Sequence, residues 1–256
     1  MTARALLAGH GLTKRYGGLT ALGDHAIRVD AGEILGVIGP NGSGKSTLFN
    51  VLTGFTRADE GELHLDDVPI LGASPARIVR LGVARTFQHT RLFRALSVLD
   101  NVLAAAALRH RAPAPACWLG LPSGRRAMRD QRALATELLD LVGLAPQSQR
   151  RAQDLPYGDQ RRVEIARALA TRPRLLLLDE PAAGLDADET AALGDVILKV
   201  RAGIGIAIVL VEHDMDLVMH VSDRIQVLAQ GRLIAEGPPA QVRADARVRE
   251  VYLGHD

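Results

Sequence analysis

The stretch from Gly39 to Thr47, GPNGSGKST, restricts what this chain can fold into more than any other feature. It fits the phosphate-binding loop pattern G-x-x-x-x-G-K-[ST]. The apolar run Ile34–Ile38 before it is typical of a buried strand, and Thr47–Leu52 after it can continue as a helix. A strand, a glycine turn and a helix start gather backbone N–H groups and the positive end of a helix dipole at one point, which favours a polyphosphate ligand. The predicted nucleotide contacts within the loop are Gly39, Pro40, Asn41, Gly42, Ser43, Gly44, Lys45, Ser46 and Thr47.

Lys45 and Ser46 are the two loop side chains to which this pattern assigns chemistry. We expect Lys45 to reach the β- and γ-phosphates and the Ser46 hydroxyl to sit on Mg²⁺. Lysine is rare here, because Lys14, Lys45 and Lys199 are the only lysines among 31 basic residues. The alternative, a glycine-rich turn capping an ordinary helix, does not explain a lysine at this position. The sequence therefore predicts a protein that binds a nucleoside triphosphate, ATP, together with Mg²⁺.

Two acids follow a second apolar run, Leu175–Leu178, which is immediately succeeded by Asp179 and Glu180. Such a strand delivers both carboxylates to the C-terminal edge of a sheet, where open α/β sheets bind ligands. We expect Asp179 to hold Mg²⁺ through water and Glu180 to polarise the attacking water. The alternative is a strand followed by a helix-capping acid, but the phosphate loop upstream favours the catalytic interpretation.

Composition limits the class of protein. With 256 residues, 47% of them hydrophobic and 23% charged, the chain can bury one large core, with or without an added lobe. A net charge of +2 does not demand a nucleic-acid partner. The single cysteine, Cys117, excludes an internal disulfide and fits a reducing compartment. No apolar run approaches the roughly 18 residues that span a bilayer, and Met1–Leu7 turns polar too soon for a signal peptide. These features predict a soluble, cytoplasmic protein.

The order of apolar patterns predicts an α/β fold. Residues 4–38 read as short strands with turns, which gives an antiparallel β part at the N-terminus. Later in the chain strands alternate with helices, and this alternation implies a mainly parallel sheet. We expect helices at 159–171, 188–201 and 214–221, strands at 174–178, 204–211, 224–229 and 232–236, and helical turns over 238–253.

The intervening residues 95–154 have helical spacing and predict a helical lobe inserted into the α/β core. Helices are expected over Val98–Leu108 and Arg125–Leu144, with a break at Ala112–Ala116. The region is rich in arginine, and a solvated helix face is the favoured interpretation; contact with lipid headgroups or a partner is the alternative. These arginines are Arg109, Arg111, Arg125, Arg126, Arg129 and Arg132.

Several further motifs resemble those of ATP-binding-cassette (ABC) ATPases. Leu155–Arg162, LPYGDQRR, resembles the family signature L-S-G-G-Q, and Ala183–Asp186 resembles the D-loop, whose acid is Asp186. Gln88 matches the Q-loop glutamine, His213 the switch histidine and Tyr16 the base-stacking aromatic, although a buried strand tyrosine would occupy the same position. The motifs occur in the family's order and cover residues 6–236. The chain is identified as a member of this family on that pattern.

The resemblance implies an arrangement of domains and sites. It implies one ABC ATPase domain over 1–256, with a RecA-like core and β subdomain at 1–94 and 155–237, the helical lobe at 95–154 and a tail at 238–256. By the resemblance, two cassettes are expected to pair head to tail, so that each signature completes the partner's ATP site. Glu180 and His213 are expected to act in catalysis, and Gln88 to join Ser46 and Asp179 around Mg²⁺. The signature residues that would contact the partner's ATP are Leu155, Pro156, Tyr157, Gly158, Asp159 and Gln160.

One position departs from the family pattern. Pro156 replaces the usual serine of the signature, and proline offers neither a hydroxyl nor an N–H to a γ-phosphate. Proline is well tolerated at a helix start, so the fold need not suffer. We expect the ATP site that this signature completes to be the weaker of two.

A finer resemblance is to the ATPase subunits of branched-chain amino-acid importers. Its residues are Ala84–Gln88 with Arg91–Phe93, Val98–Val102, Arg161–Arg167, Asp179–Leu185, Glu212–Met215 and Val251–Gly254. It implies an ATP-hydrolysing, energy-coupling subunit at the inner face of the cell membrane. The implied partners are a second, different ATPase (a homodimer being the alternative), two permease subunits and a solute-binding protein. Amide and urea importers have related cassettes and are the alternative within this class.

Two functions outside transport compete with this interpretation. A soluble ABC ATPase acting on nucleic acid or ribosomes usually carries two cassettes or long coiled-coil insertions, and 256 residues contain neither. A small-molecule P-loop kinase would not need the signature or the switch histidine. The sequence therefore favours transport without a nucleic-acid partner.

Overall fold

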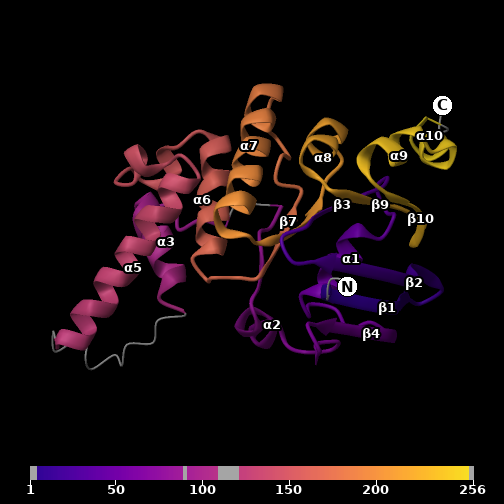
Figure 1. Ribbon diagram of the computed structural model, residues 1–256, viewed down its shortest axis with the longest axis horizontal. Helices are drawn as coiled ribbons and strands as arrows, with labels where there is room; N and C mark the ends of the chain where they lie inside the picture. The colour runs from indigo at the N-terminus through magenta and orange to yellow at the C-terminus, as the bar shows by residue number, and fades with distance from the viewer. Residues whose placement is uncertain (1–4, 89–90, 109–120, 254–256) are drawn as a thin grey trace.

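The computed structural model describes residues 5–88, 91–108 and 121–253, which form two sheets with helices around them (Figure 1). The larger sheet has the strand order β10-β9-β3-β8-β7-β6. From β9 to β6 neighbouring strands run parallel, whereas β10 is antiparallel to β9. The mainly parallel sheet predicted from the alternating pattern is therefore present. Its strands are β3 (Ile34–Ile38), β6 (Val83–Arg85), β7 (Leu175–Asp179), β8 (Ala207–Val211), β9 (Arg224–Ala229) and β10 (Arg232–Gly237).

The N-terminal sheet is antiparallel, with the order β2-β1-β4-β5. The prediction of short strands in this region was wrong, because β1 and β2 are each 12 residues long. Both strands contain register shifts, and Gly11 in β1 (φ 64°) and Asp24 in β2 (φ 49°) have left-handed backbone. Such irregularities interrupt the apolar alternation without ending the strand. The strands are β1 (Ala5–Tyr16), β2 (Leu19–Asp30), β4 (Glu60–Leu65) and β5 (Val68–Pro69).

Helices flank the larger sheet, and a helical group lies at the end of the molecule opposite the N-terminal sheet (Figure 1). That group contains α3 and α5, which pack against each other and against α6. The helices are α1 (Lys45–Leu52), α2 (Pro75–Leu81), α3 (Val98–Ala106), α5 (Pro122–Leu141), α6 (Tyr157–Leu169), α7 (Ala187–Ile204), α8 (Met215–Val221), α9 (Pro239–Ala244) and α10 (Ala246–Leu253), with short 3₁₀ turns at Ala145–Gln147 and Ala152–Asp154.

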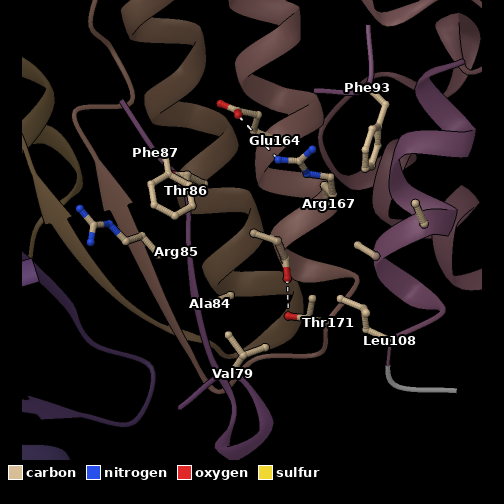
Figure 2. A pocket seen from close by; sticks show the side chains of 13 residues that line it. Val79, Ala84, Arg85, Thr86, Phe87, Phe93, Leu108, Glu164, Arg167 and Thr171 are labelled. Atoms are coloured by element: carbon tan, nitrogen blue, oxygen red, sulfur yellow. Dashed lines mark hydrogen bonds and ion pairs between the residues drawn. The ribbon is translucent and has the colours of Figure 1, made fainter. Parts of the chain in front are cut away.

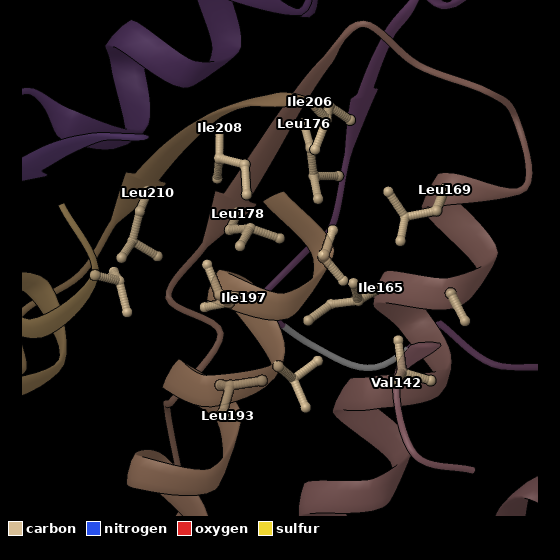
Figure 3. Packing of buried hydrophobic residues seen from close by; sticks show 14 of the residues in the cluster. Val142, Ile165, Leu169, Leu176, Leu178, Leu193, Ile197, Ile206, Ile208 and Leu210 are labelled. Atoms are coloured by element: carbon tan, nitrogen blue, oxygen red, sulfur yellow. The ribbon is translucent and has the colours of Figure 1, made fainter. Parts of the chain in front are cut away.

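The central strands are apolar along their whole length because both faces of the sheet are covered. Leu176 and Leu178 of β7 point to one face, where they join a cluster with residues of α6 and α7 (Figure 3). Leu175 and Leu177 belong to the second cluster, together with Phe49 of α1 and residues of the N-terminal sheet. A strand in this position has no solvent face, which explains the run of four leucines before Asp179.

Several predicted boundaries differ from the structure by about three residues. Ile204 was expected to begin a strand, but it is the last residue of α7, and β8 begins only at Ala207. Gly205 ends the helix with left-handed backbone (φ 70°), and its N–H donates to the carbonyl of Arg201 at 2.8 Å. Likewise α5 runs from Pro122 to Leu141, three residues earlier at each end than predicted.

Part of the predicted arginine-rich region can be placed. Arg125, Arg126, Arg129 and Arg132 lie exposed on α5. Arg109 and Arg111, the predicted break at 112–116 and Cys117 lie outside the described residues. No helix in the described part of the chain combines the length and the apolar character needed to cross a membrane.

His25 is a buried ionisable group between the two sheets. It lies on β2, fully buried, close to Glu236 of β10 and Gln226 of β9. Burial lowers the pKa of His25 to about 4, and the Glu236 carboxylate and Gln226 side chain oppose this shift only in part. The folded protein therefore holds a neutral imidazole over a pH range in which the unfolded chain takes up a proton.

We predict that His25 makes the protein less stable in mild acid. Because the unfolded state binds the extra proton, stability is fully present above pH 6.5 and falls as the pH drops toward 4, by on the order of 3 kcal/mol. His25→Gln, which cannot titrate, should flatten this part of the profile. Urea unfolding at several pH values measures the difference, and identical pH profiles for the two proteins would contradict the assignment.

Candidate active site

The phosphate loop connects β3 to α1, and its two outer glycines permit close backbone contacts. Gly39 has φ 155° and Gly44, the N-cap of α1, has φ 108°. A Cβ at Gly39 would lie 2.2 Å from the carbonyl oxygen of Leu228, and one at Gly44 would lie 2.4 Å from that of Ala21. Glycine is required at both places because any side chain would clash with a main-chain atom that has no room to move.

Lys45 lies in the first turn of α1 and is buried. Its Nζ donates hydrogen bonds to the carbonyl oxygens of Gly39 at 2.6 Å and Pro40 at 3.0 Å. Burial lowers the pKa of Lys45, while the carboxylates of Glu180 and Glu212 act in the opposite direction. The ammonium group is thus held inside the loop, where the N–H groups of the first helical turn have no intrahelical partner.

A cavity of about 630 Å³ lies over this loop. Glu180 lines it from the end of β7, and Tyr16 lines it from the end of β1. Tyr16 is half exposed, and Lys14 Nζ lies 5.3 Å from the centroid of its ring. The sequence did not indicate the remaining walls of the cavity, which are contributed by the start of β2 and by Gln230 in the turn between β9 and β10. The lining residues are Tyr16, Leu19, Thr20, Ala21, Asn41–Thr47, Glu180 and Gln230.

Glu180 has a backbone conformation that is uncommon for a residue with a side chain, with φ 45°. Its N–H donates to the carbonyl of Val211 at 2.9 Å, which fixes the turn after β7. Gln88 Nε2 donates to Glu180 Oε2 at 2.7 Å. Two residues predicted for the site, 92 positions apart, are therefore in direct contact.

Asp179 is buried at the end of β7 and makes an ion pair that the sequence did not reveal. Arg85, on the adjacent strand β6, donates to Asp179 Oδ2 at 2.6 Å. The same guanidinium donates to Asn50 Oδ1 at 2.8 Å and to Thr53 at 3.1 Å, at the end of α1. Its charge also lies over the ring of Phe87, 5.2 Å from the centroid. Arg85 thus ties the phosphate-loop helix to the strand that carries the acids.

His213 follows β8, and its neighbour Glu212 is a second feature that sequence reasoning missed. Glu212 is fully buried and accepts hydrogen bonds from the N–H groups of Ala182 at 2.7 Å and His213 at 2.9 Å. Burial raises the pKa of Glu212, although these hydrogen bonds oppose the shift. The imidazole is 63% exposed, with Nδ1 3.4 Å from Glu212 Oε2. His213 is not one of the described residues that line the cavity over the phosphate loop.

The signature residues lie at the start of α6, where Pro156 is the N-cap. Leu155 and Gly158 are buried, and Asp159 accepts a hydrogen bond from Gln147 at 3.0 Å. Gln160 donates to the carbonyl of Leu155 at 3.0 Å. Within the described part of the chain, none of the signature residues lines the cavity over the phosphate loop. The signature and the loop of one chain are therefore parts of two separate surfaces.

Arg161 connects the signature helix to the glutamine loop. It is buried on α6 and donates to the carbonyl oxygens of Phe87 (3.1 Å) and Gln88. Glu164, one turn later, accepts from the N–H of Arg91 at 2.7 Å. These contacts hold the chain on both sides of residues 89–90 against α6. The spacing of apolar residues predicted that α6 is a helix. It did not indicate that the polar side chains of this helix would bind the segment around Gln88.

Asp186, predicted for the D-loop, is the N-cap of α7. Its side chain accepts from the N–H of Glu189 at 2.8 Å, and Glu189 accepts from the N–H of Asp186 at 3.3 Å. This reciprocal pair is a capping box, which stabilises the start of the helix. The structure thus gives Asp186 a local role, and its predicted function stays a prediction.

Comparison with known families gives two matches. The ABC transporter model matches residues 22–183, and a model described as branched-chain amino acid ATP-binding cassette transporter matches residues 232–256. The high-affinity branched-chain amino acid transport ATP-binding protein LivG of Escherichia coli K12 is 44% identical, over 98% of this chain and 99% of its own. The corresponding protein BraF of Pseudomonas aeruginosa is 43% identical with the same coverage.

Solved structures agree. The ADP conformation of MJ1267, an ATP-binding cassette of an ABC transporter, has a TM-score of 0.84 at 32% identity, covering 98% of this chain and 99% of that one. A dimeric cassette, MJ0796 bound to ADP and Pi, has a TM-score of 0.75 at 26% identity, over 91% and 98% of the two chains. The predicted family and the predicted ABC ATPase fold are confirmed by these similarities. The chain belongs to the ATP-binding proteins of ABC transporters and is an ATP-hydrolysing enzyme.

Proposed function

We propose that this chain is the energy-coupling ATPase of an importer for branched-chain amino acids. The observation that carries the proposal is the similarity over nearly the full chain to relatives named for branched-chain amino acid transport. The separate match of residues 232–256 to a model of such transporters supports it at the C-terminal end. In this architecture other subunits bind the solute, so a related amide or urea importer is the alternative that transport assays must exclude.

The residues at the end of β7 fit the Mg²⁺ that accompanies ATP. Ser46 is exposed in the cavity, and Asp179 Oδ1 has no hydrogen-bond partner among the described residues, since Arg85 uses Oδ2. The described residues contain no group of three His, Cys, Asp or Glu side chains suited to a metal. Mg²⁺ needs no such group, because one or two protein oxygens and the phosphates hold it. We assign Ser46, Asp179 and Gln88 to this ion, which would neutralise charge on the phosphate oxygens.

Hydrolysis requires a base beside the γ-phosphate, and Glu180 is the carboxylate that lines the phosphate-loop cavity. We assign it to accept a proton from the attacking water, with Gln88 holding its side chain at 2.7 Å. His213 is assigned to the transition state because it matches the family's switch histidine; its imidazole is exposed and does not line the cavity of its own chain. Tyr16 is assigned to the adenine base, as a half-exposed ring at the cavity wall.

A second cassette completes each site in this proposal. The signature lies away from the cavity of its own chain, so a head-to-tail partner must bring its signature to that cavity. We propose that the partner is a different ATPase, and that Pro156 makes the site completed by this chain the weaker one, because proline provides no N–H or hydroxyl. Arg161 of α6 donates to the carbonyl of Phe87, beside Gln88. In this proposal the contact connects the signature, which belongs to the partner's ATP site, with the chain's own ATP site.

An apolar hollow beside the glutamine loop suits a helix of a permease. Figure 2 shows this hollow, about 410 Å³, between α2, β6, α3 and α6. Phe93 and Leu108 on its wall are exposed, and Phe87, next to Gln88, forms another wall. Such a surface accepts the apolar face of a short helix. We propose that two permeases dock here on the two cassettes, with residues 95–154 acting as one lobe, and that the complex lies on the cytoplasmic side of the membrane.

We predict that Lys45→Ala weakens ATP binding several-fold or more, because charge-assisted contacts to phosphate contribute roughly 1.5–3 kcal/mol. Calorimetry on the purified chain measures the affinity. Lys199→Ala, which removes a lysine on α7 outside the cavity, is the matched control. Equal affinities for the parent and Lys45→Ala would exclude the phosphate-loop assignment.

Glu180→Gln should leave ATP affinity nearly unchanged and lower turnover by on the order of 10² or more, as expected when a general base is lost. The variant also keeps the size of the side chain beside Gln88, so the fold is preserved. ATPase assays and nucleotide binding distinguish the two effects. Hydrolysis at the parental rate would mean that another group is the base.

Coexpression tests the transport proposal. The chain alone should be mostly monomeric and slow, whereas coexpression with a second ATPase and two permeases should give a membrane complex whose hydrolysis is stimulated by leucine, isoleucine or valine in the presence of the solute-binding protein. Phe93→Glu in the apolar hollow should block assembly without preventing ATP binding. Stimulation by urea or short amides would select the alternative importer class, and stimulation by RNA or DNA alone would reject transport.

A further inference from the structure

Helix α5 is divided into a packed half and a projecting half. In its second half Ala135, Leu138 and Leu139 are buried against the helical group. In its first half Gly124 is the one fully buried residue between Pro122 and Arg132, all of which the structure describes. Figure 1 shows this first half extending beyond the rest of the molecule.

The apolar side of α5 continues past the body of the protein. Leu121, Met128, Ala135 and Val142 are spaced by seven residues and therefore lie on one side of the helix. Ala135 and Val142 are completely buried, whereas Leu121 is 45% and Met128 59% exposed. An apolar stripe that is covered at one end of a helix and exposed at the other indicates a surface that meets something outside this chain.

Arginines surround the exposed end of the stripe. Arg125 and Arg129 line a hollow together with Pro122 and Met128. Arg132, four residues after Met128, lies on the same side of the helix. With Arg126 these make four exposed arginines against one acid, Asp130, and none of the four forms an ion pair within the described part of the chain.

The projecting half of α5 lies on the side of the molecule that carries the apolar hollow. The last turn of α3 leads to Leu108 and α2 carries Val79, and both residues line that hollow (Figure 2). In Figure 1 the start of α5, the end of α3 and α2 all lie toward the lower edge of the molecule. If a permease occupies the hollow, as proposed above, this edge faces the bilayer.

We propose that the segment Leu121–Arg132, which comprises the N-cap and the first half of α5 and is called the basic arm, binds the anionic phospholipid surface beside the permease. Arginines contact lipid phosphate while Met128 and Leu121 enter the boundary between headgroups and acyl chains, the pattern of interfacial amphipathic helices. Lipid is favoured over a protein partner because four exposed arginines, against the single acid Asp130, border a narrow apolar stripe, and this combination suits an anionic headgroup layer above acyl chains. The proposal rests on the proposed function, which supplies the orientation toward the membrane.

Vesicle binding tests the proposal on the purified full chain. We expect the chain to sediment with vesicles of phosphatidylglycerol mixed with phosphatidylcholine, to bind phosphatidylcholine vesicles at least about tenfold more weakly, and to dissociate at high salt. The variant Arg125→Gln/Arg126→Gln/Arg129→Gln/Arg132→Gln should lose at least about tenfold in binding to the anionic vesicles. Met128→Ser should weaken binding without changing its salt dependence.

The matched control removes the same charge elsewhere. Arg172→Gln/Arg232→Gln/Arg243→Gln/Arg249→Gln changes four exposed arginines outside the arm and should retain binding. If both quadruple variants lose vesicle binding equally, the effect depends only on net charge and the proposal is overturned. It is also overturned if the parent chain does not bind the anionic vesicles. An arm variant that binds vesicles like the parent but fails to assemble with permeases would assign the arm to protein contact instead. The assembled transporter distinguishes the two proposals. If its solute-stimulated hydrolysis is normal but the parent and the arm variant bind anionic lipid equally, the proposed role of the arm is rejected and the transport function stands.

Discussion

Main-chain contact at the phosphate loop is the constraint on which the site depends. Gly39 and Gly44 bring the loop so close to Leu228 and Ala21 that a single added carbon would meet a carbonyl oxygen at each place. These contacts join the loop to β9 and to β2, which belong to different sheets. The loop is therefore one of the places where the two sheets meet, and both of them restrict its shape. Lys45 is held inside this shape by two carbonyls of the loop itself.

An ion pair fixes the carboxylate at the end of β7. Asp179 leaves a strand buried on both faces, where an unpaired carboxylate would be strongly destabilising. Arg85 neutralises it and, through Asn50, binds the end of the loop helix. The ion pair with Arg85 stabilises the buried carboxylate through Oδ2. Oδ1 of Asp179 has no hydrogen-bond partner among the described residues, so this oxygen can accept a contact from the proposed metal ion or its water. Glu180, one residue on, faces the cavity in a backbone conformation that costs energy, as often occurs at functional sites.

The signature residues and the phosphate loop are separate on the molecule but linked by polar contacts. The two surfaces lie on different parts of one molecule, yet Arg161 joins the signature helix to Gln88, which contacts Glu180. Polar contacts therefore run without a break from the signature helix to Glu180, the proposed general base. The apolar hollow borders the same segment through Phe87. Partner cassette and permease are thus proposed to act on one short stretch of chain, and the basic arm of α5 extends the contact surface toward the lipid.

The sequence by itself determined the local features: the glycine loop, the four leucines before Asp179, and the alternation that gives a parallel sheet. These follow from short-range rules of sterics and burial, which act on neighbouring residues. Tertiary structure alone decided that Arg85 pairs with Asp179, that Glu212 is buried beneath His213 and that Gln230 borders the cavity over the phosphate loop. It also joined the predicted short N-terminal strands into two long ones, since bulges break the pattern but not the pairing. Such contacts join residues far apart in the chain, and only the packed sheets and helices bring them within hydrogen-bond distance.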